Sequence, residues 1–109
     1  MNGYALLNEA ARLIGLDTAD EKLKTIGLTL LNSALADIEL TPIHSLSARV
    51  KVKGVKQVEA VKFCLAALVS NAIGDTAQAE NMSRIYTSKK GELKSVIGRV
   101  SERLFLGED

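Results

Sequence analysis

The sequence predicts an all-α protein, a small bundle of about four helices with a long extended loop between the second and third helices. Apolar residues recur at steps of three and four along most of the chain. Glycines and capping residues stand where these patterns stop and restart. Leu, Ala, Val and Ile carry the apolar content, with no tryptophan, as suits closely packed helices. At 109 residues the chain is too short for two domains, so we expect one helical domain over residues 1–109.

The first helical pattern lies near the start of the chain and ends at Gly15. Its apolar face consists of Tyr4, Leu7, Ala10, Ala11 and Ile14. Glycine just past the last periodic residue adopts the left-handed conformation that closes a helix. We therefore expect the first helix to end at Gly15 and a turn to follow.

The second helix has a capping signal at its start. Thr18 is followed three residues later by Glu21, the spacing of a capping box, and nearby acids suit the positive end of the helix dipole. About five turns of apolar face follow, made of Leu23, Ile26, Leu30, Leu31, Ala34, Leu35 and Ile38. Gly27 lies on that face, where either the close approach of another helix or a lack of constraint explains a glycine. Asp37 and Glu39, at the helix end, are expected to be solvated.

Residues 39–57 interrupt the helical period. Pro42 disfavours helix at Thr41, and the stretch ARVKVKGVK, residues 48–56, alternates basic and apolar residues. This alternation predicts an extended segment or a short strand with its lysine side exposed. Because a single strand is not a sheet, the segment is either a long ordered loop or a piece that pairs with something else.

The third helix is predicted to begin near Lys56. Its centre, residues 63–69, is apolar nearly all round. Both of its faces should therefore be covered, either by the chain's own core or by another subunit.

The stretch AIGDTAQAE, residues 72–80, separates the last two helices. Gly74 is expected to close the third helix and Asp75 to cap the fourth, with Gln78 completing a capping-box pattern. The fourth helix keeps its period from about residue 76 to 104, roughly 43 Å, unless Gly91 breaks or bends it. Such a helix outreaches a core of this size, so its far end would need a partner.

The sequence contains no pattern typical of catalysis or cofactor binding. His44 is the only histidine and Cys64 the only cysteine, whereas metal sites and nucleophile–base pairs need more partners. We expect a loop or packing role for His44 and core packing for Cys64. The acids are scattered singly, and no phosphate-binding glycine motif includes Gly74. We therefore expect no enzyme activity, no cofactor, no metal and no small-molecule substrate.

Charge and hydropathy restrict the class of protein further. Fourteen basic residues against thirteen acidic ones argue against a protein whose main task is coating nucleic acid. The longest unbroken apolar run, residues 63–69, is too short to span a membrane. We recognise no secretory signal, and one cysteine cannot form an internal disulfide. These features predict a soluble protein of a reducing cytoplasm.

A basic segment is the most suggestive feature of the chain. Residues 49–62 carry five basic residues and one acid, whereas residues 1–48 carry three basic and six acidic residues. The candidates for contact with DNA phosphates or with an acidic surface of another subunit are Arg49, Lys51, Lys53 and Lys56. The other interpretation is a solvated edge that its lysines protect from aggregation. The lack of interleaved aromatic residues favours this second interpretation.

A spaced set of residues extends over about residues 5–90. It consists of Gly15, Asp17, Glu21, Leu23, Asn32 and Ala34, then Gly74, Asp75, Ala79 and Tyr86. A capped helix of this kind, followed by a later helix that runs into a G-D turn, resembles the head-tail connector (adaptor, head-completion) proteins of tailed bacteriophages and prophages. The chain departs from the pattern in its basic loop, where many of those proteins carry acids and prolines.

The resemblance implies an all-helical structural subunit of the virion, present in the host cytoplasm during assembly. It implies a homo-oligomeric ring between portal and tail proteins that extends the DNA channel, with at most non-specific contact with DNA and none with a membrane. A ring needs a heterologous interface, and we expect residues 40–54 and the C-terminal helix to reach onto adjacent copies. The alternatives are a small helical DNA-binding regulator or a protein-interaction module using residues 49–62, and an enzyme ranks last.

Overall fold

The computed structural model confirms the all-α architecture. It describes residues 1–17 and 21–106, and for residues 94–106 the helical backbone alone. The helices are α1 (Gly3–Leu13), α2 (Glu21–Asp37), α3 (Gly54–Ala72) and α4 (Thr76–Leu106). The described residues contain no β-strand, and one isolated antiparallel bridge joins Asn2 to Arg49.

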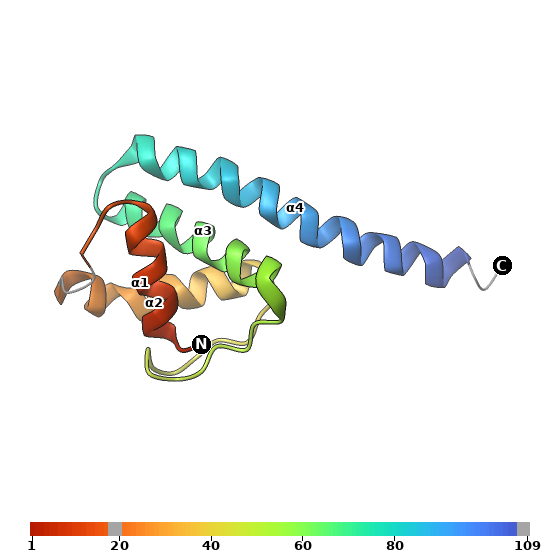
Figure 1. Ribbon diagram of the computed structural model, residues 1–109, viewed down its shortest axis with the longest axis horizontal. Coiled ribbons are helices and arrows are strands. Elements are labelled where there is room, and N and C mark those ends of the chain that lie inside the picture. The colour runs from red at the N-terminus through yellow and green to blue at the C-terminus, as the bar shows by residue number, and fades with distance from the viewer. Residues whose placement is uncertain (18–20, 107–109) are drawn as a thin grey trace.

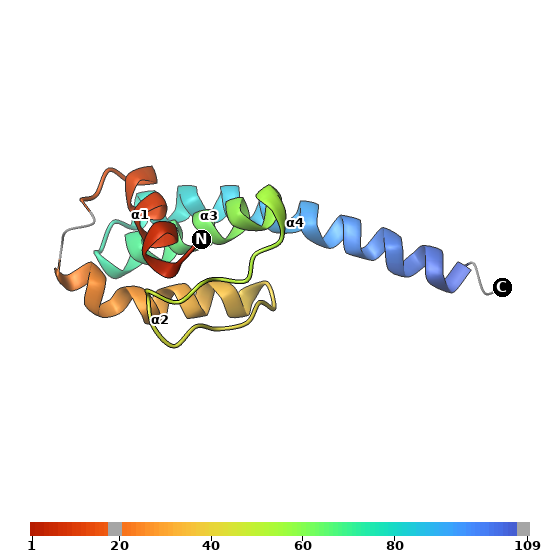
Figure 2. The ribbon, with the colours of Figure 1, turned by 60° about the horizontal axis from the view of Figure 1, so that its bottom comes forward.

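The helix α3 is the central element of the body. All three other helices pack against it, whereas no Cα atom of the described parts of α1 or α2 lies within 8 Å of α4. After the turn at its start, α4 runs back alongside α3 and then continues past it, as both views show (Figures 1 and 2). The C-terminal part of α4 therefore leaves the body as a projecting helix.

The core is built mainly from α1, α2, α3 and the connection between α2 and α3. Its largest fully buried apolar side chains are Leu6, Leu7, Leu31, Leu35, Val61, Leu65 and Val69. The chain's own helices cover most of the apolar centre of α3. Cys64, Leu65, Ala66 and Ala67 are buried, and Phe63 and Leu68 are partly buried. Among its described residues, α4 contributes one buried side chain, Met82. Tyr4, predicted to lie on the inner face of α1, is 43% exposed.

Three helices end with the same backbone arrangement. Gly15 after α1, Glu39 after α2 and Gly74 after α3 have φ of 73°, 61° and 84°. In each case the next residue donates its N–H to a carbonyl five residues back, which is the Schellman motif. These bonds are Leu16 to Ala11 at 2.9 Å, Leu40 to Leu35 at 2.8 Å and Asp75 to Ser70 at 2.9 Å. The two glycine ends were predicted, and the end at Glu39 was not.

The helix starts differ in part from the prediction. Asp75 caps α4, because its Oδ1 accepts the N–H of Gln78 at 3.1 Å. The N–H of Asp75, which a full capping box would engage, donates instead to Ser70. The cap of α1 is Asn2, whose Oδ1 accepts the N–H of Ala5 at 2.9 Å, and no prediction was made for it. Thr18 lies outside the described residues.

The structure also answers two questions about glycines and corrects the start of α3. A Cβ atom added at Gly27 would lie 2.6 Å from Cδ2 of Leu7, so the close approach of α1 explains this glycine. Gly91 does not break α4, which is helical on both sides of it. The helix α3 begins at Gly54, two residues before the predicted start at Lys56.

Candidate interaction site

The connection between α2 and α3, residues 38–53, is fixed to the body of its own chain. Three of its apolar side chains are buried, namely Ile43, Leu46 and Val50. The side-chain amide of Asn32 in α2 holds the backbone of Ile43 at both ends: Nδ2 donates to the carbonyl at 2.8 Å, and Oδ1 accepts the N–H at 2.9 Å. The apolar side of the connection therefore packs inside the subunit, and its outer side faces away from the core.

The predicted extended segment pairs with the N-terminus of the same chain. Val50 donates to the carbonyl of Met1 at 2.9 Å, Gly3 donates to Ala48 at 3.1 Å, and Tyr4 donates to Leu46 at 2.9 Å. Of the two predicted forms, an extended segment or a short strand, the described residues do not contain the strand. Pairing amounts to the single bridge at Arg49, because the N–H of Val52 turns back to the carbonyl of Val50 at 3.1 Å, a γ-turn that interrupts the extended run.

The four candidate basic residues all lie on the surface. Arg49, Lys51 and Lys53 are exposed, while the valines between them point inward, with Val50 only 3% exposed and Val52 half-buried. Lys56 is exposed in the first turn of α3. Within the described part of the chain, no carboxylate lies within 4 Å of these four side chains. They form the "basic row", Arg49, Lys51, Lys53 and Lys56.

Lys62, the fifth basic residue of the segment, is arranged differently. Its Nζ lies 2.8 Å from Oε1 of Glu59, one turn earlier in α3, and both side chains are partly buried. The charge of Lys62 is therefore matched within the helix, and the basic row stands without it.

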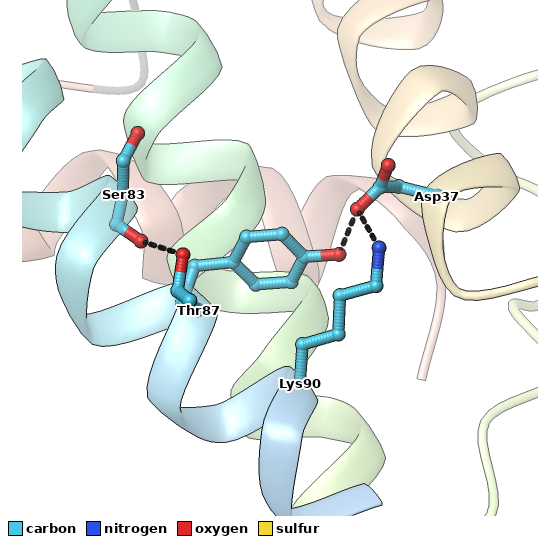
Figure 3. A network of polar contacts seen from close by, with 5 residues as sticks. Asp37, Ser83, Thr87 and Lys90 are labelled. Carbon is cyan, nitrogen blue, oxygen red and sulfur yellow. Dashed lines mark hydrogen bonds and ion pairs between the residues drawn. The ribbon is translucent and has the colours of Figure 1, made fainter. Parts of the chain in front are cut away.

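A polar cluster between α2 and α4 was not predicted. Oδ2 of Asp37, the last residue of α2, accepts a hydrogen bond from the hydroxyl of Tyr86 and an ion pair from Nζ of Lys90 at 2.9 Å (Figure 3). On the same helix, the hydroxyl of Thr87 donates to the carbonyl of Ser83 at 2.9 Å. Asp37, expected to be solvated, is instead half-exposed and engaged by two side chains.

Burial changes the titration of two groups beside Asp37. Burial, reinforced by the nearby charge of Asp37, raises the pKa of the Cys64 thiol to about 11. Burial and the hydrogen bond donated to Asp37 raise the pKa of Tyr86. Both groups are therefore neutral at physiological pH, and Cys64 is an inert core residue, in agreement with its predicted packing role.

The length of α4 determines how far it projects. It has 31 residues against 19 in α3, so it runs about 18 Å beyond its partner at 1.5 Å per residue. The molecule is accordingly elongated, with extents of 56 × 30 × 18 Å. The end of α4 is separated from every other described helix in both views (Figures 1 and 2).

Two kinds of site are not found in the described residues. No group of three or more His, Cys, Asp or Glu side chains in this part of the chain is placed to hold a metal ion, and His44 is exposed on the connection. No described helix combines the length and the apolar character that crossing a membrane requires.

Comparisons of the chain with protein-family models, with curated proteins and with solved structures found no match. The site is therefore interpreted from its own geometry, which offers a projecting helix, an exposed basic row and a polar cluster where α2 meets α4.

Proposed function

We propose that this protein is a structural subunit that assembles with copies of itself, forming a ring between portal and tail proteins during virion assembly. The resemblance to phage head-tail connector proteins suggests this role. The observation that carries the proposal is the projection of α4 beyond α3 (Figure 1).

A projecting helix of this length needs support from another molecule. Isolated helices shorter than about 12 to 15 residues are marginal in water, and most helical stability in proteins comes from packing of an apolar face. The sequence of the projecting part keeps the helical period with Val96, Val100 and Leu104. A neighbouring copy that covers this face would stabilise α4 and supply the heterologous contact that a ring requires.

In this proposal the connection between α2 and α3 contributes to the fold with its apolar side and to assembly with its outer side only. Ile43, Leu46 and Val50 belong to the chain's own core, so deletion of residues 40–54 would unfold the subunit and would not test assembly. The outer side of the connection, together with the basic row on it and on the first turn of α3, is the part that meets a neighbour or DNA.

The proposal is tested by changing the projecting part of α4 in the full chain. We expect Val100→Glu to abolish oligomers above the single-chain mass of 11.7 kDa, measured by light scattering over a range of concentrations. Ser88→Glu, an exposed site on α4 beside the body, is the matched control and should leave assembly unchanged. A wild-type chain that stays monomeric both alone and with portal-bearing heads would contradict the proposal.

The genes beside the coding sequence provide an independent test. Portal and capsid genes on one side and tail genes on the other would support the assignment to a virion. A metabolic operon around the gene would overturn it.

A second candidate function rests on the basic row. Four exposed cations without carboxylates nearby are suited to phosphate contacts, so the alternative is a small DNA-binding or protein-interaction module. It predicts duplex binding by the free subunit that weakens steeply with salt, and a smaller salt slope in Lys51→Gln/Lys53→Gln. Lys24→Gln, an exposed lysine on α2, is the control. No duplex binding at low salt would exclude DNA as the partner of the free subunit.

A further inference from the structure

The helix α4 packs along α3, and its backbone approaches no other described helix. Its buried described side chain is Met82, with Ile85 and Tyr86 partly buried. Packing of side-chain ridges into grooves favours particular angles between two helices, with a scatter of about 15 to 20°. The connection to α3 is a short turn at Gly74, whose φ is 84°. Packing on α3 alone therefore leaves this range of angles open to α4, and a contact with a second helix narrows it.

Asp37 adds a directional contact from a different helix. Its Oδ2 accepts from Tyr86 and Lys90, which are four residues apart and so lie on the same face of α4 (Figure 3). Among the described contacts of α4, these two reach beyond α3. They connect the end of α2 with the middle of α4, close to the point where α4 leaves the body.

The position of Asp37 is electrostatically unfavourable for α2. It is the last residue of the helix, where the dipole disfavours an acid, and the last turn of α2 contains no basic residue. The contacts with Lys90 and Tyr86 offset that cost. The contacts with α4 therefore stabilise a carboxylate at this position.

We propose that Asp37 is a positioning residue that fixes the direction in which α4 leaves the body, and so the place where α4 meets a second copy of this chain. The part that concerns the second copy rests on the proposed function. The direction of α4 is a property of the free subunit and is measured without assembly.

The experiment measures the distance between spin labels at Ser33→Cys on α2 and Ser101→Cys on α4 by pulsed electron paramagnetic resonance. Cys64 is buried, and a protein without the added cysteines checks that it stays unlabelled. We expect Asp37→Asn to broaden the distance distribution at least twofold at unchanged helical content. The charge-exchanged pair Asp37→Lys/Lys90→Asp should narrow the distance distribution again, because it restores the ion pair between α2 and α4. Loss of packing at Asp37 alone would not be reversed by this exchange.

The matched control is Glu80→Gln, which removes an exposed carboxylate that pairs with Arg84 on α4 itself at 3.8 Å. Its distance distribution should equal that of the wild type. An unchanged distribution in both Asp37→Asn and Tyr86→Phe would overturn the proposal. If Asp37→Asn fails to fold, Tyr86→Phe alone tests the contact between Asp37 and α4.

Assembly of the same variants separates this proposal from the proposed function. A broadened distribution together with at least tenfold weaker self-association supports both parts. A broadened distribution with unchanged self-association overturns the link to the second copy. A wild-type chain that does not assemble refutes the proposed function, whereas the distance measurement still decides whether Asp37 directs α4.

Discussion

The side chain of Asn32 in α2 pairs with the backbone of Ile43 as a neighbouring strand would, donating to its carbonyl and accepting its N–H. The two residues are eleven positions apart and lie on either side of the turn that ends α2. Because Ile43 is buried, water cannot readily replace these bonds. One side-chain amide thus fixes the connection that carries Arg49, Lys51 and Lys53 of the basic row.

Loss of this amide should destabilise the fold. Asn32→Ala leaves two part-buried backbone groups of Ile43 without their side-chain partner, which costs about 1 kcal/mol or more. The free energy of unfolding in urea measures the effect. Asn32→Asp retains the acceptor but not the donor. Its free energy of unfolding should lie between those of the wild type and Asn32→Ala. Asn71→Ala, an exposed position, is the control, and equal stability of Asn32→Ala and Asn71→Ala would refute this account.

Replacement of Gly3 by alanine should also destabilise the protein. The new Cβ atom would lie 2.9 Å from the carbonyl oxygen of Leu46 and 2.8 Å from Cδ1 of Ile43. Because the first of these is a backbone atom held by its own hydrogen bond from Tyr4, it cannot move cheaply. We expect a loss of about 1 to 3 kcal/mol, measured by thermal and urea unfolding.

Gly91→Ala should have the opposite effect. Gly91 lies inside α4, and a Cβ atom there would meet nothing within 4 Å. Alanine then gains about 0.8 to 1 kcal/mol in helix propensity. Circular dichroism at 222 nm should show higher helicity and a higher Tm. Lower stability in Gly91→Ala would mean that a neighbour covers this position.

Local signals predicted those parts of the fold that depend on neighbouring residues. The ends of α1 and α3 follow from Gly15 and Gly74, and the cap of α4 follows from Asp75. Glu39 adopts a positive φ without being glycine or asparagine, because Leu40 must turn back to pack against the core. That requirement is tertiary, so no local pattern indicates it.

For the candidate site, the sequence predicted which side chains are exposed but not which residues contact one another. The alternation around Val50 correctly placed Arg49, Lys51 and Lys53 outside. The same alternation could not indicate that the N-terminus pairs with this segment through a single bridge. The contact between Asp37 and Tyr86 joins residues 49 positions apart, and a periodic pattern in either helix carries no information on it.

Alkaline pH should destabilise the protein through the groups beside Asp37. The Cys64 pKa rises from 9.0 to about 11 on folding, so above pH 9 the unfolded chain releases a proton that the folded chain retains. The contribution of Cys64 is complete below pH 9 and is lost as the pH rises to about 11. The raised pKa of Tyr86 adds to the loss at higher pH. For Cys64 the slope is at most about 1.4 kcal/mol per pH unit.

Urea unfolding between pH 8 and 11 measures this dependence. Cys64→Ala should flatten the fall in stability between pH 9 and 11, because the variant has no thiol to ionise in the unfolded chain. Tyr86→Phe should flatten it at the upper end of the range. If the free energy of unfolding falls with pH at the same slope in the wild type and in Cys64→Ala, the thiol does not contribute to the alkaline loss of stability.

Asp75 should matter for stability and not for chemistry. Its carboxylate accepts the N–H of Gln78 and so caps the first turn of α4. Asp75→Ala removes that cap and should cost about 1 kcal/mol, measured by urea unfolding. Asp75→Asn retains an acceptor oxygen, and its stability should stay close to that of the wild type.

Since the cap acts only through the fold, combining Asp75→Ala with the stabilising Gly91→Ala should restore both stability and self-association. A double variant that is as stable as the wild type but fails to assemble would show that Asp75 contacts a partner directly.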